Sequence, residues 1–338
     1  MRKSSLVLAS CLVSLVFIII VIGNVVIVAQ NSITGTWKSE NYWEKQEKTD
    51  GKIHLSFERR SENGARNQNG SSYLYSDLQG LSREQTQNGK VSFKLVREAG
   101  TVDCEGAFVN GKGAGTFSFT PDSGYLAAMR SRGFDFEKSK SNNYDGIEGR
   151  LLSAALNNVT TALADDLKSV DLGLLDVDDL FKAAIFKIDS KFMAEMKATG
   201  FPNLRMEDLV KARIFKIDAD FVRKVAEMGF VTKDFEQLVK FSIFKVTPEY
   251  LAELRAAGFN NLSSEEVIKF RIFKVTSELL TDLRNDGFAN LSAEEVVKFR
   301  IFKIDPEFIR KAKASDPNIT AEELVQMKIG VRRIKYNN

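Results

Sequence analysis

A phrase of 29 residues recurs five times in the second half of this chain and constrains its fold more than any other feature. Each copy contains the tripeptide Ile-Phe-Lys, at 29 positions after the previous one. The five tripeptides are Ile185-Phe186-Lys187, Ile214-Phe215-Lys216, Ile243-Phe244-Lys245, Ile272-Phe273-Lys274 and Ile301-Phe302-Lys303. A fixed period of this length is typical of stacked supersecondary units, so we expect each copy to pack on its neighbours.

One period has the pattern of two short helices. In the third copy, Pro248 suits the first turn of a helix and Gly258 suits its left-handed C-terminus. Ser263 and Glu266 then have the spacing of a capping box, which predicts a second helix over about 264–274. Helices this short are not stable alone in water, so the sequence predicts a stack of helical hairpins, an α-solenoid.

The repeat array extends beyond the five clear copies. Val159-Thr160 lies three periods before Val246-Thr247, and residues 120–134 have the pattern of another first helix with a two-residue insertion. The expected organisation is a transition with a first atypical repeat at 120–158, the α-helical repeat array at 159–330 and a basic tail at 331–338. Atypical terminal copies are expected of caps.

The N-terminus predicts export. Residues 6–29 carry no charge, follow Arg2 and Lys3, and are long enough to span a bilayer. By the positive-inside rule, a retained anchor gives a single-pass membrane protein whose C-terminal bulk lies outside the cytoplasm. Ala29-Gln30 also suits signal-peptidase cleavage, which gives a secreted or periplasmic protein instead. Residues 1–30 are therefore either a signal anchor or a signal peptide.

Residues 33–119 have a different composition and read as a small antiparallel β-domain. Several segments alternate apolar and polar residues as half-buried strands do: 53–58, 91–95, 102–108 and 115–119. Asn110-Gly111 is a strong hairpin signal. Polar stretches are expected to be loops at about 59–72 and 82–90. The domain is predicted to be a sandwich or a partly open barrel.

Composition excludes several kinds of chemistry. The net charge is only +3 with 28% charged residues, which gives no general basic field for nucleic acid. His54 is the only histidine, so an H-E-x-x-H zinc site, which needs two histidines, is ruled out. Cys11 lies in the apolar segment and Cys104 on an apolar strand face, where a small core residue is expected. We predict no enzymatic activity, no cofactor and no metal.

The second helix of each copy carries basic residues that would align on stacking. Lysines pair in this interpretation with glutamates one turn earlier: Lys211 with Glu207, Lys240 with Glu236, Lys269 with Glu265 and Lys298 with Glu294. Lys216 and its equivalents satisfy the helix C-terminus. The candidate interaction face is the remaining row, Arg213, Arg271 and Arg300, which Ser242 interrupts. The phenylalanines from Phe186 to Phe302 are expected in the core.

At this point the sequence resembles a known group. The phrase V-T-P-E-Y-L-A-E-L-R-A-A-G-F-N-N-L-S-S-E-E-V-I-K-F-R-I-F-K, from Val246 to Lys274, is similar to repeats in uncharacterised exported regions of bacterial proteins. Some of these regions are fused to membrane metallopeptidases of the BlaR type, and the segment from Val91 to Gly115 resembles the β-domain that precedes those repeats. This sequence lacks the peptidase part and its zinc motif. The resemblance implies a sensory or interaction module in a bacterial envelope.

The predicted fold is α+β and multidomain: an N-terminal membrane segment, a small antiparallel β-domain and an α-solenoid. The predicted function is a non-enzymatic bacterial envelope protein that binds an envelope protein partner through the solenoid surface. The alternative is binding of anionic lipid or cell-wall polymer by the β-domain or by the basic face of the repeats. If residues 6–29 are retained, both interpretations place the protein at the membrane, and both exclude nucleic acid as a partner.

Overall fold

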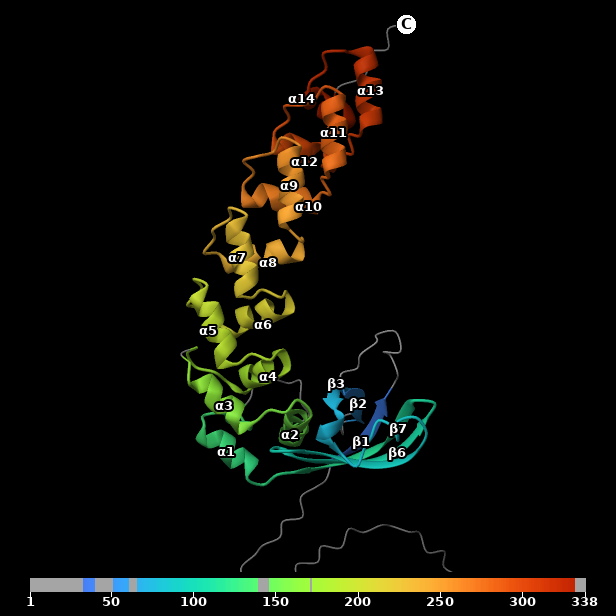
Figure 1. The fold of residues 1–338 in the computed structure, drawn as a ribbon, viewed down its shortest axis with the longest axis vertical. Coiled ribbons are helices and arrows are strands. Elements are labelled where there is room, and N and C mark those ends of the chain that lie inside the picture. The colour runs from blue at the N-terminus through green and yellow to red at the C-terminus, as the bar shows by residue number, and fades with distance from the viewer. Residues whose placement is uncertain (1–32, 40–50, 61–65, 139–145, 171, 332–338) are drawn as a thin grey trace, which may run out of the picture. The chain divides into compact units, whose positions relative to one another are not determined.

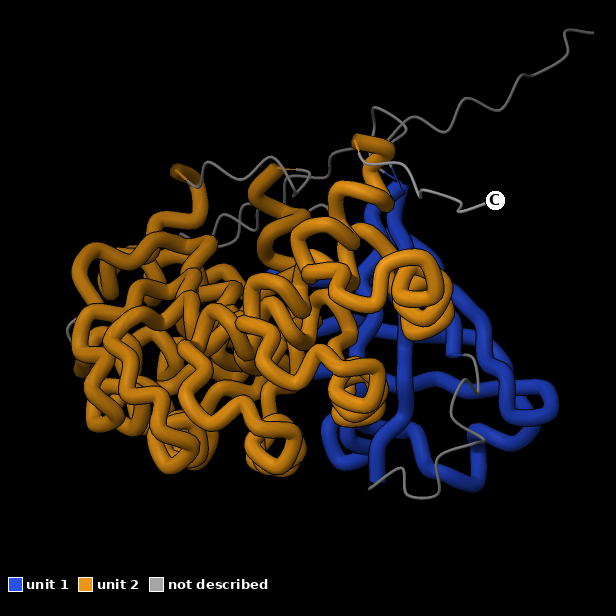
Figure 2. Tube along the Cα trace, turned by 90° about the horizontal axis from the view of Figure 1, so that it is seen from above, with its two compact units in different colours: residues 1–96, 100–121 blue, residues 97–99, 122–338 orange. Residues whose placement is uncertain are grey.

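The computed structural model describes residues 33–39, 51–60, 66–138, 146–170 and 172–331 (Figure 1). These residues divide into two compact units, of which unit 1 ends at Pro121 and unit 2 contains the helices together with the short segment 97–99 (Figure 2). The predicted membrane segment at 6–29, the cleavage site Ala29-Gln30, Cys11 and residues 332–338 of the tail lie outside the described residues. Within the described ranges, no helix is both long and apolar enough to cross a membrane.

Unit 1 is one curled, antiparallel sheet of seven strands. The strands are β1 Ile33–Ser39, β2 Lys52–Arg60, β3 Arg66–Leu74, β4 Leu78–Gln79, β5 Gly89–Arg97, β6 Gly100–Val109 and β7 Lys112–Pro121. Their order in the sheet is β3-β2-β1-β7-β6-β5-β4. The alternation in the sequence correctly predicted β2, β5, β6 and β7, and Asn110-Gly111 forms the predicted turn between β6 and β7.

The prediction of a loop at 59–72 is wrong, because β2 runs to Arg60 and β3 begins at Arg66. Only Tyr73 is buried in β3, so the strand lacks the apolar alternation that marks a half-buried strand. The strand is held by its ladder with β2 and by cross-strand side-chain pairs such as Arg66 with Glu58, 2.6 Å apart. A strand at the sheet edge, stabilised in this way, needs no apolar face.

Trp37 is the centre of the sheet core. Its side chain is fully buried, and its indole N–H donates to the carbonyl of Glu105 at 3.2 Å. Its ring meets Phe93 edge-on, with the ring centroids 5.2 Å apart. Gly115 lies directly against it, since a Cβ there would overlap both the indole and the Glu105 carbonyl. The buried tryptophan therefore requires glycine at position 115.

Among the described residues of unit 2, fourteen helices follow one another as seven pairs. The bounds are α1 Tyr125–Ser131, α2 Gly146–Leu156, α3 Thr161–Lys168, α4 Val177–Phe186, α5 Ser190–Ala198, α6 Met206–Ile214, α7 Ala219–Glu227, α8 Phe235–Ile243, α9 Pro248–Ala256, α10 Ser264–Ile272, α11 Ser277–Asn285, α12 Ala293–Ile301, α13 Pro306–Ser315 and α14 Ala321–Lys328. The helical repeats are confirmed, as is the start of α10 at Ser264, but α10 ends at Ile272, two residues before the predicted end, because Lys274 has a left-handed backbone conformation.

The predicted capping motifs are also confirmed. Ser263 and Glu266 form a capping box at the start of α10, with the Ser263 side chain accepting from the Glu266 N–H. Gly258 follows α9 with a φ of +98°, and the next N–H, that of Phe259, donates to the Leu254 carbonyl at 2.9 Å. This bonding is a Schellman motif, which satisfies carbonyls at the helix end and needs a left-handed residue.

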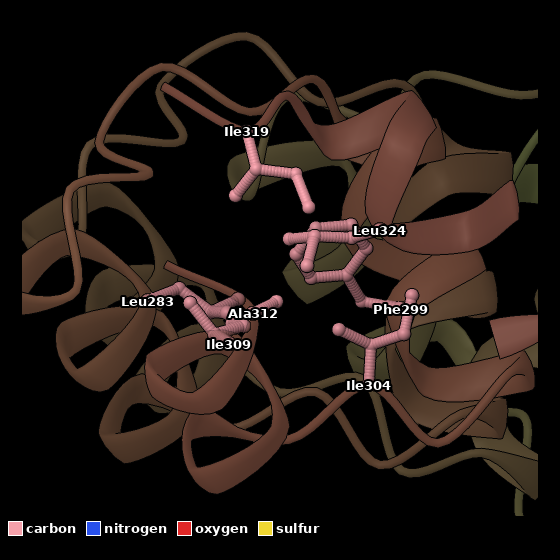
Figure 3. Packing of buried hydrophobic residues seen from close by; sticks show 7 residues of the cluster. All are labelled: Leu283, Phe299, Ile304, Ile309, Ala312, Ile319 and Leu324. Atoms are coloured by element: carbon pink, nitrogen blue, oxygen red, sulfur yellow. The ribbon is translucent and has the colours of Figure 1, made fainter. Parts of the chain in front are cut away.

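Consecutive pairs share their cores. Figure 3 shows one cluster to which α11, α12, α13 and α14 all contribute, together with the loops between them. Its buried members are Leu283, Phe299, Ile304, Ile309, Ala312, Ile319 and Leu324. Because helices of eight to ten residues bury too little surface alone, each pair is stabilised by the apolar side chains of the next.

The phenylalanines from Phe186 to Phe302 are only partly buried, so their expected place in the core is confirmed in part: Phe302 packs against the buried cluster of α11–α14 without being fully buried itself. The aromatic residues that fill the later pairs stand three positions earlier in each phrase: Phe241, Phe270 and Phe299 are at most 1% exposed. Three residues are almost one helical turn, so both phenylalanines lie near the same side of the helix. The earlier one lies within the helix and points into the pair. The later one, such as Phe273, is the C-cap, where the chain leaves the helix.

Candidate interaction surface on the helical repeats

Five even-numbered helices, α4 to α12, end in the same conformation. In α10 the last helical residue is Ile272, Phe273 is the C-cap, and Lys274 follows with a φ of +53°. The next N–H, that of Val275, donates to the Phe270 carbonyl at 2.8 Å, which completes a Schellman motif. We call these five ends the cap row, and its members are the five Ile-Phe-Lys tripeptides of the sequence.

Each isoleucine of the cap row is exposed. Their exposed fractions lie between 45% and 52% for Ile185, Ile214, Ile243, Ile272 and Ile301. In α2, which ends before the cap row, Leu156 takes the corresponding place and is only 4% exposed. A single exposed apolar side chain is ordinary, but five at one position of five successive repeats form a pattern that packing within the protein does not require.

Each lysine of the cap row is exposed and has a left-handed backbone conformation. Their φ values lie between 51° and 56° at Lys187, Lys216, Lys245, Lys274 and Lys303. Residues other than glycine and asparagine are disfavoured in this conformation by about 1 kcal/mol. Outside the cap row the position is filled by Asn158 after α2 and by Gly330 after α14. Among the described residues, no ion pair or side-chain hydrogen bond involves any of the five lysines.

Hydrogen bonds join the five caps into one continuous row. The donor always stands directly before the isoleucine, and the acceptor is a carbonyl of the preceding cap. The four bonds run from Arg213 to Lys187, from Ser242 to Phe215 at 2.6 Å, from Arg271 to Lys245 at 2.7 Å and from Arg300 to Phe273 at 2.8 Å. One bond therefore spans each junction between neighbouring caps.

The structure thus places the predicted interaction residues Arg213, Arg271 and Arg300 between the caps. Ser242 interrupts the arginine row in the sequence, yet its hydroxyl makes the same contact with a shorter side chain. The guanidinium of Arg271 also lies over the Tyr250 ring, 3.7 Å from its centroid. These residues tie the repeats together, and their binding to an external partner stays a prediction.

A second set of cations ties the odd-numbered helices together at the later junctions. Arg255 donates to the Met228 carbonyl at 3.2 Å, and Arg284 donates to the Ala257 carbonyl. Lys313 continues the series on Asp286. A carbonyl at a helix C-terminus has no partner within its helix, so a cation from the next repeat both satisfies it and meets the negative end of the helix dipole.

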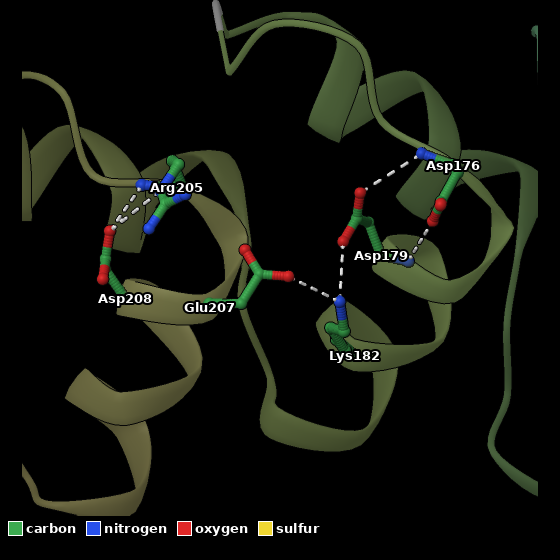
Figure 4. A network of polar contacts seen from close by, with 6 residues as sticks. All are labelled: Asp176, Asp179, Lys182, Arg205, Glu207 and Asp208. Atoms are coloured by element: carbon green, nitrogen blue, oxygen red, sulfur yellow. Dashed lines mark hydrogen bonds and ion pairs between the residues drawn. The ribbon is translucent and has the colours of Figure 1, made fainter.

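The interpretation of lysine–glutamate pairs within one helix is confirmed only for Lys298 and Glu294, 2.8 Å apart. At two other repeats a lysine pairs across to the next repeat instead. Lys182 lies 3.0 Å from Asp179 in its own helix and 2.9 Å from Glu207 in α6 (Figure 4). The hydrogen bond from Lys182 holds the pKa of Glu207 below its usual range. In the following repeat, Lys211 bonds to Glu236.

Groups that could support other chemistry have structural roles where the structure describes them. Cys104 is 1% exposed on the inner face of β6, and burial raises the pKa of its thiol well above the ordinary value. A thiol in that state is a poor nucleophile. Across the described ranges, no group of three or more histidine, cysteine, aspartate or glutamate side chains is placed to hold a metal ion.

Comparisons with known proteins add no relative. No family model matches the chain, and neither a curated protein nor a solved structure matches it significantly. A functional interpretation of this protein therefore depends on its own geometry, of which the cap row is the most regular exposed part.

Proposed function

We propose that this protein is a non-enzymatic component of a bacterial envelope whose helical pairs form an α-solenoid that binds a partner protein. In this proposal residues 6–29 hold the chain at the membrane, and the bulk of the chain lies outside the cytoplasm. The sheet unit connects the membrane segment to the repeats. The repeats present the binding surface, as stacked supersecondary units commonly do.

The observation that carries the proposal is the continuity of the cap row. Burial of apolar surface is favourable by about 25 cal/mol for every Å² removed from water. An isolated chain that leaves five isoleucines exposed forgoes this free energy. Contiguous exposed apolar surface bordered by charge is typical of protein interaction sites. The junction hydrogen bonds keep the row ordered before any partner arrives, which lowers the entropic cost of binding.

The alternative, binding of anionic lipid or wall polymer through the arginines, has weaker support. Each of Arg213, Arg271 and Arg300 already donates to a main-chain carbonyl. Arg213 and Arg271 also lie over the rings of Phe192 and Tyr250. Moving these guanidinium groups to an external anion breaks contacts that hold the repeats together.

The test is affinity capture from native membranes with the full-length, C-terminally tagged chain and mild crosslinking. We expect one stoichiometric envelope protein to be captured by the wild type and lost from the variant Ile214→Asp/Ile243→Asp/Ile272→Asp. The matched control is Val231→Asp, because Val231 is 86% exposed in a loop outside the cap row. Equal capture by all three proteins contradicts the cap row as the binding surface. Consistent turnover in a hydrolase screen contradicts the non-enzymatic assignment.

A further inference from the structure

The cap row has a charge pattern that specifies its partner more closely than apolar exposure alone. Resting on the proposed function, we infer that it binds a polypeptide segment in which carboxylates stand among apolar side chains, with Lys245 and Lys274 as the main contacts for the carboxylates. The isoleucines contact the apolar side chains of that segment. The partner is thus an acidic, apolar stretch of protein.

The lysines of the cap row supply charge that no ion pair within the described residues engages. At the lysine position inside the even-numbered helices, Lys182, Lys211 and Lys298 bond to carboxylates, whereas Lys240 and Lys269 have no ion pair among the described residues. In the cap row, no ion pair is found for any of the five lysines within the described part of the chain. Their left-handed backbone is also less favourable than glycine would be. A cation kept five times at an unfavourable position, and left without a partner, points to a carboxylate from outside the chain.

The N-cap residue that follows each lysine differs between the centre of the row and its ends. Two residues after each lysine stands the N-cap of the next helix, whose side chain accepts a backbone hydrogen bond. That N-cap is Asp189, Asp218 or Asp305 at the ends of the row, and Thr247 or Thr276 in the middle. An aspartate next to the lysine offsets its charge for an approaching anion, and a threonine does not. The carboxylates of the partner are therefore expected opposite Lys245 and Lys274.

The same charges favour a polypeptide over an anionic bilayer. A bilayer surface attracts basic residues along its whole plane, and it repels the exposed carboxylates that border the row at Asp189, Asp218 and Asp305. Surfaces that bind membranes place large apolar groups where they enter the headgroup region, with basic residues around them. The isoleucines are only about half exposed, which suits contact with side chains rather than insertion.

The test is a selection of random 16-residue peptides displayed on phage against the full chain. We expect enriched peptides to combine aspartate or glutamate with isoleucine, leucine, valine or phenylalanine. Binding of one enriched peptide is then measured by fluorescence polarisation. Lys245→Glu/Lys274→Glu should weaken it by at least about tenfold, since each change turns an attraction into a repulsion. The control Lys233→Glu/Lys311→Glu makes the same change in net charge at exposed lysines outside the row and should bind as wild type.

A charge swap guards against an unfolding artefact. A peptide whose glutamates are replaced by lysine should regain affinity for Lys245→Glu/Lys274→Glu and lose it for wild type. Enriched peptides that bind all variants equally, or that are neutral or basic, overturn the inference but leave protein binding as the function. If no peptide is enriched and the chain instead binds vesicles of phosphatidylglycerol, but not of phosphatidylcholine, both the inference and the proposed function are wrong.

Discussion

The two units of this chain reach stability through contacts of different sequence range. In the sheet, Trp37 bonds to a carbonyl 68 residues away, and its aromatic neighbours are equally remote. In the helical unit, the hydrogen bonds that join consecutive caps span only 26 or 27 residues. The sheet therefore has one core that forms or fails as a whole, whereas each pair of helices depends chiefly on its neighbours.

The largest effect is expected for Trp37→Ala. Removal of a buried tryptophan costs about 3–5 kcal/mol of unfolding free energy, and no other side chain can replace its contacts with β5, β6 and Gly115. Hydrogen exchange measured by mass spectrometry should show lost protection across β1, β2, β5, β6 and β7, with protection retained in α9–α12. Val109→Ala, at an exposed end of β6, is the control. Partial loss, confined to β1, contradicts a single sheet core.

A smaller and more local effect is expected for Leu283→Ala in the shared cluster of Figure 3. The cavity costs about 2–4 kcal/mol, because Leu283 is 1% exposed and packs among residues of neighbouring pairs. Loss of exchange protection should be confined to α11–α14. Protection in the sheet should not change, nor should Val231→Ala alter either unit. Loss that spreads to α1–α6 contradicts the difference in range between the two units.

Arg271→Met tests the junction bonds directly. It removes the donor to the Lys245 carbonyl and the contact with the Tyr250 ring, which together are worth about 1–3 kcal/mol. Chemical denaturation should show the loss, and amide exchange should accelerate at the end of α8. Arg271→Lys keeps the charge and should lose less. An unchanged Arg271→Met variant shows that the caps are not joined through this position.

Lys245→Gly should stabilise the chain while it weakens binding. Glycine adopts the left-handed conformation freely, so a gain of about 0.5–1 kcal/mol is expected. Lys240→Gly, inside α8, is the matched control and should lose about 1 kcal/mol. Thermal denaturation distinguishes the two. If Lys245→Gly is destabilising, the lysine side chain stabilises the fold, and its left-handed position no longer argues for a role in binding.

The smallest effect concerns pH. Hydrogen bonds from the Ser263 backbone and side chain hold the pKa of Glu266 below its usual range. The ionised carboxylate therefore adds stability that is fully present above the unfolded pKa and is lost as the pH falls through the lower folded pKa. Glu266→Gln should reduce the stability difference between neutral and mildly acidic pH. If variant and wild type show the same dependence of stability on pH, this capping box does not contribute to the loss of stability in acid.

Sequence predicts the local features of this fold better than its junctions. The Ser263–Glu266 capping box and the glycine ends of the odd-numbered helices follow from rules within one helix, and the structure confirms them. The polar strand β3 was missed because an edge strand held by its ladder shows no apolar alternation. The half-buried Phe273 was placed too deep because its period matches that of the true core residue Phe270.

The cap row was only partly predictable. The alignment of Arg213, Ser242 and Arg271 at one repeat position is visible in the sequence, and a shared donor role would have explained the serine. The acceptors are main-chain carbonyls, which carry no sequence signature. The left-handed lysines run against conformational preference, since glycine is the residue expected there. Bonds that cross repeats, such as Lys182 with Glu207, likewise compete with pairs inside one helix that sequence spacing makes more obvious.

The form of the junction bond also bears on how such a gene changes. Each inner unit of the cap row gives one donor to the unit before it and one carbonyl to the unit after it, so the same kind of bond forms at every junction between caps. Unequal recombination that adds or removes 29 codons within the inner units therefore keeps one cap-to-cap donor and one carbonyl at each remaining junction. The cap row then lengthens or shortens by one cap at a time. Its length is inherited as the number of repeats in the gene rather than as a set of point mutations.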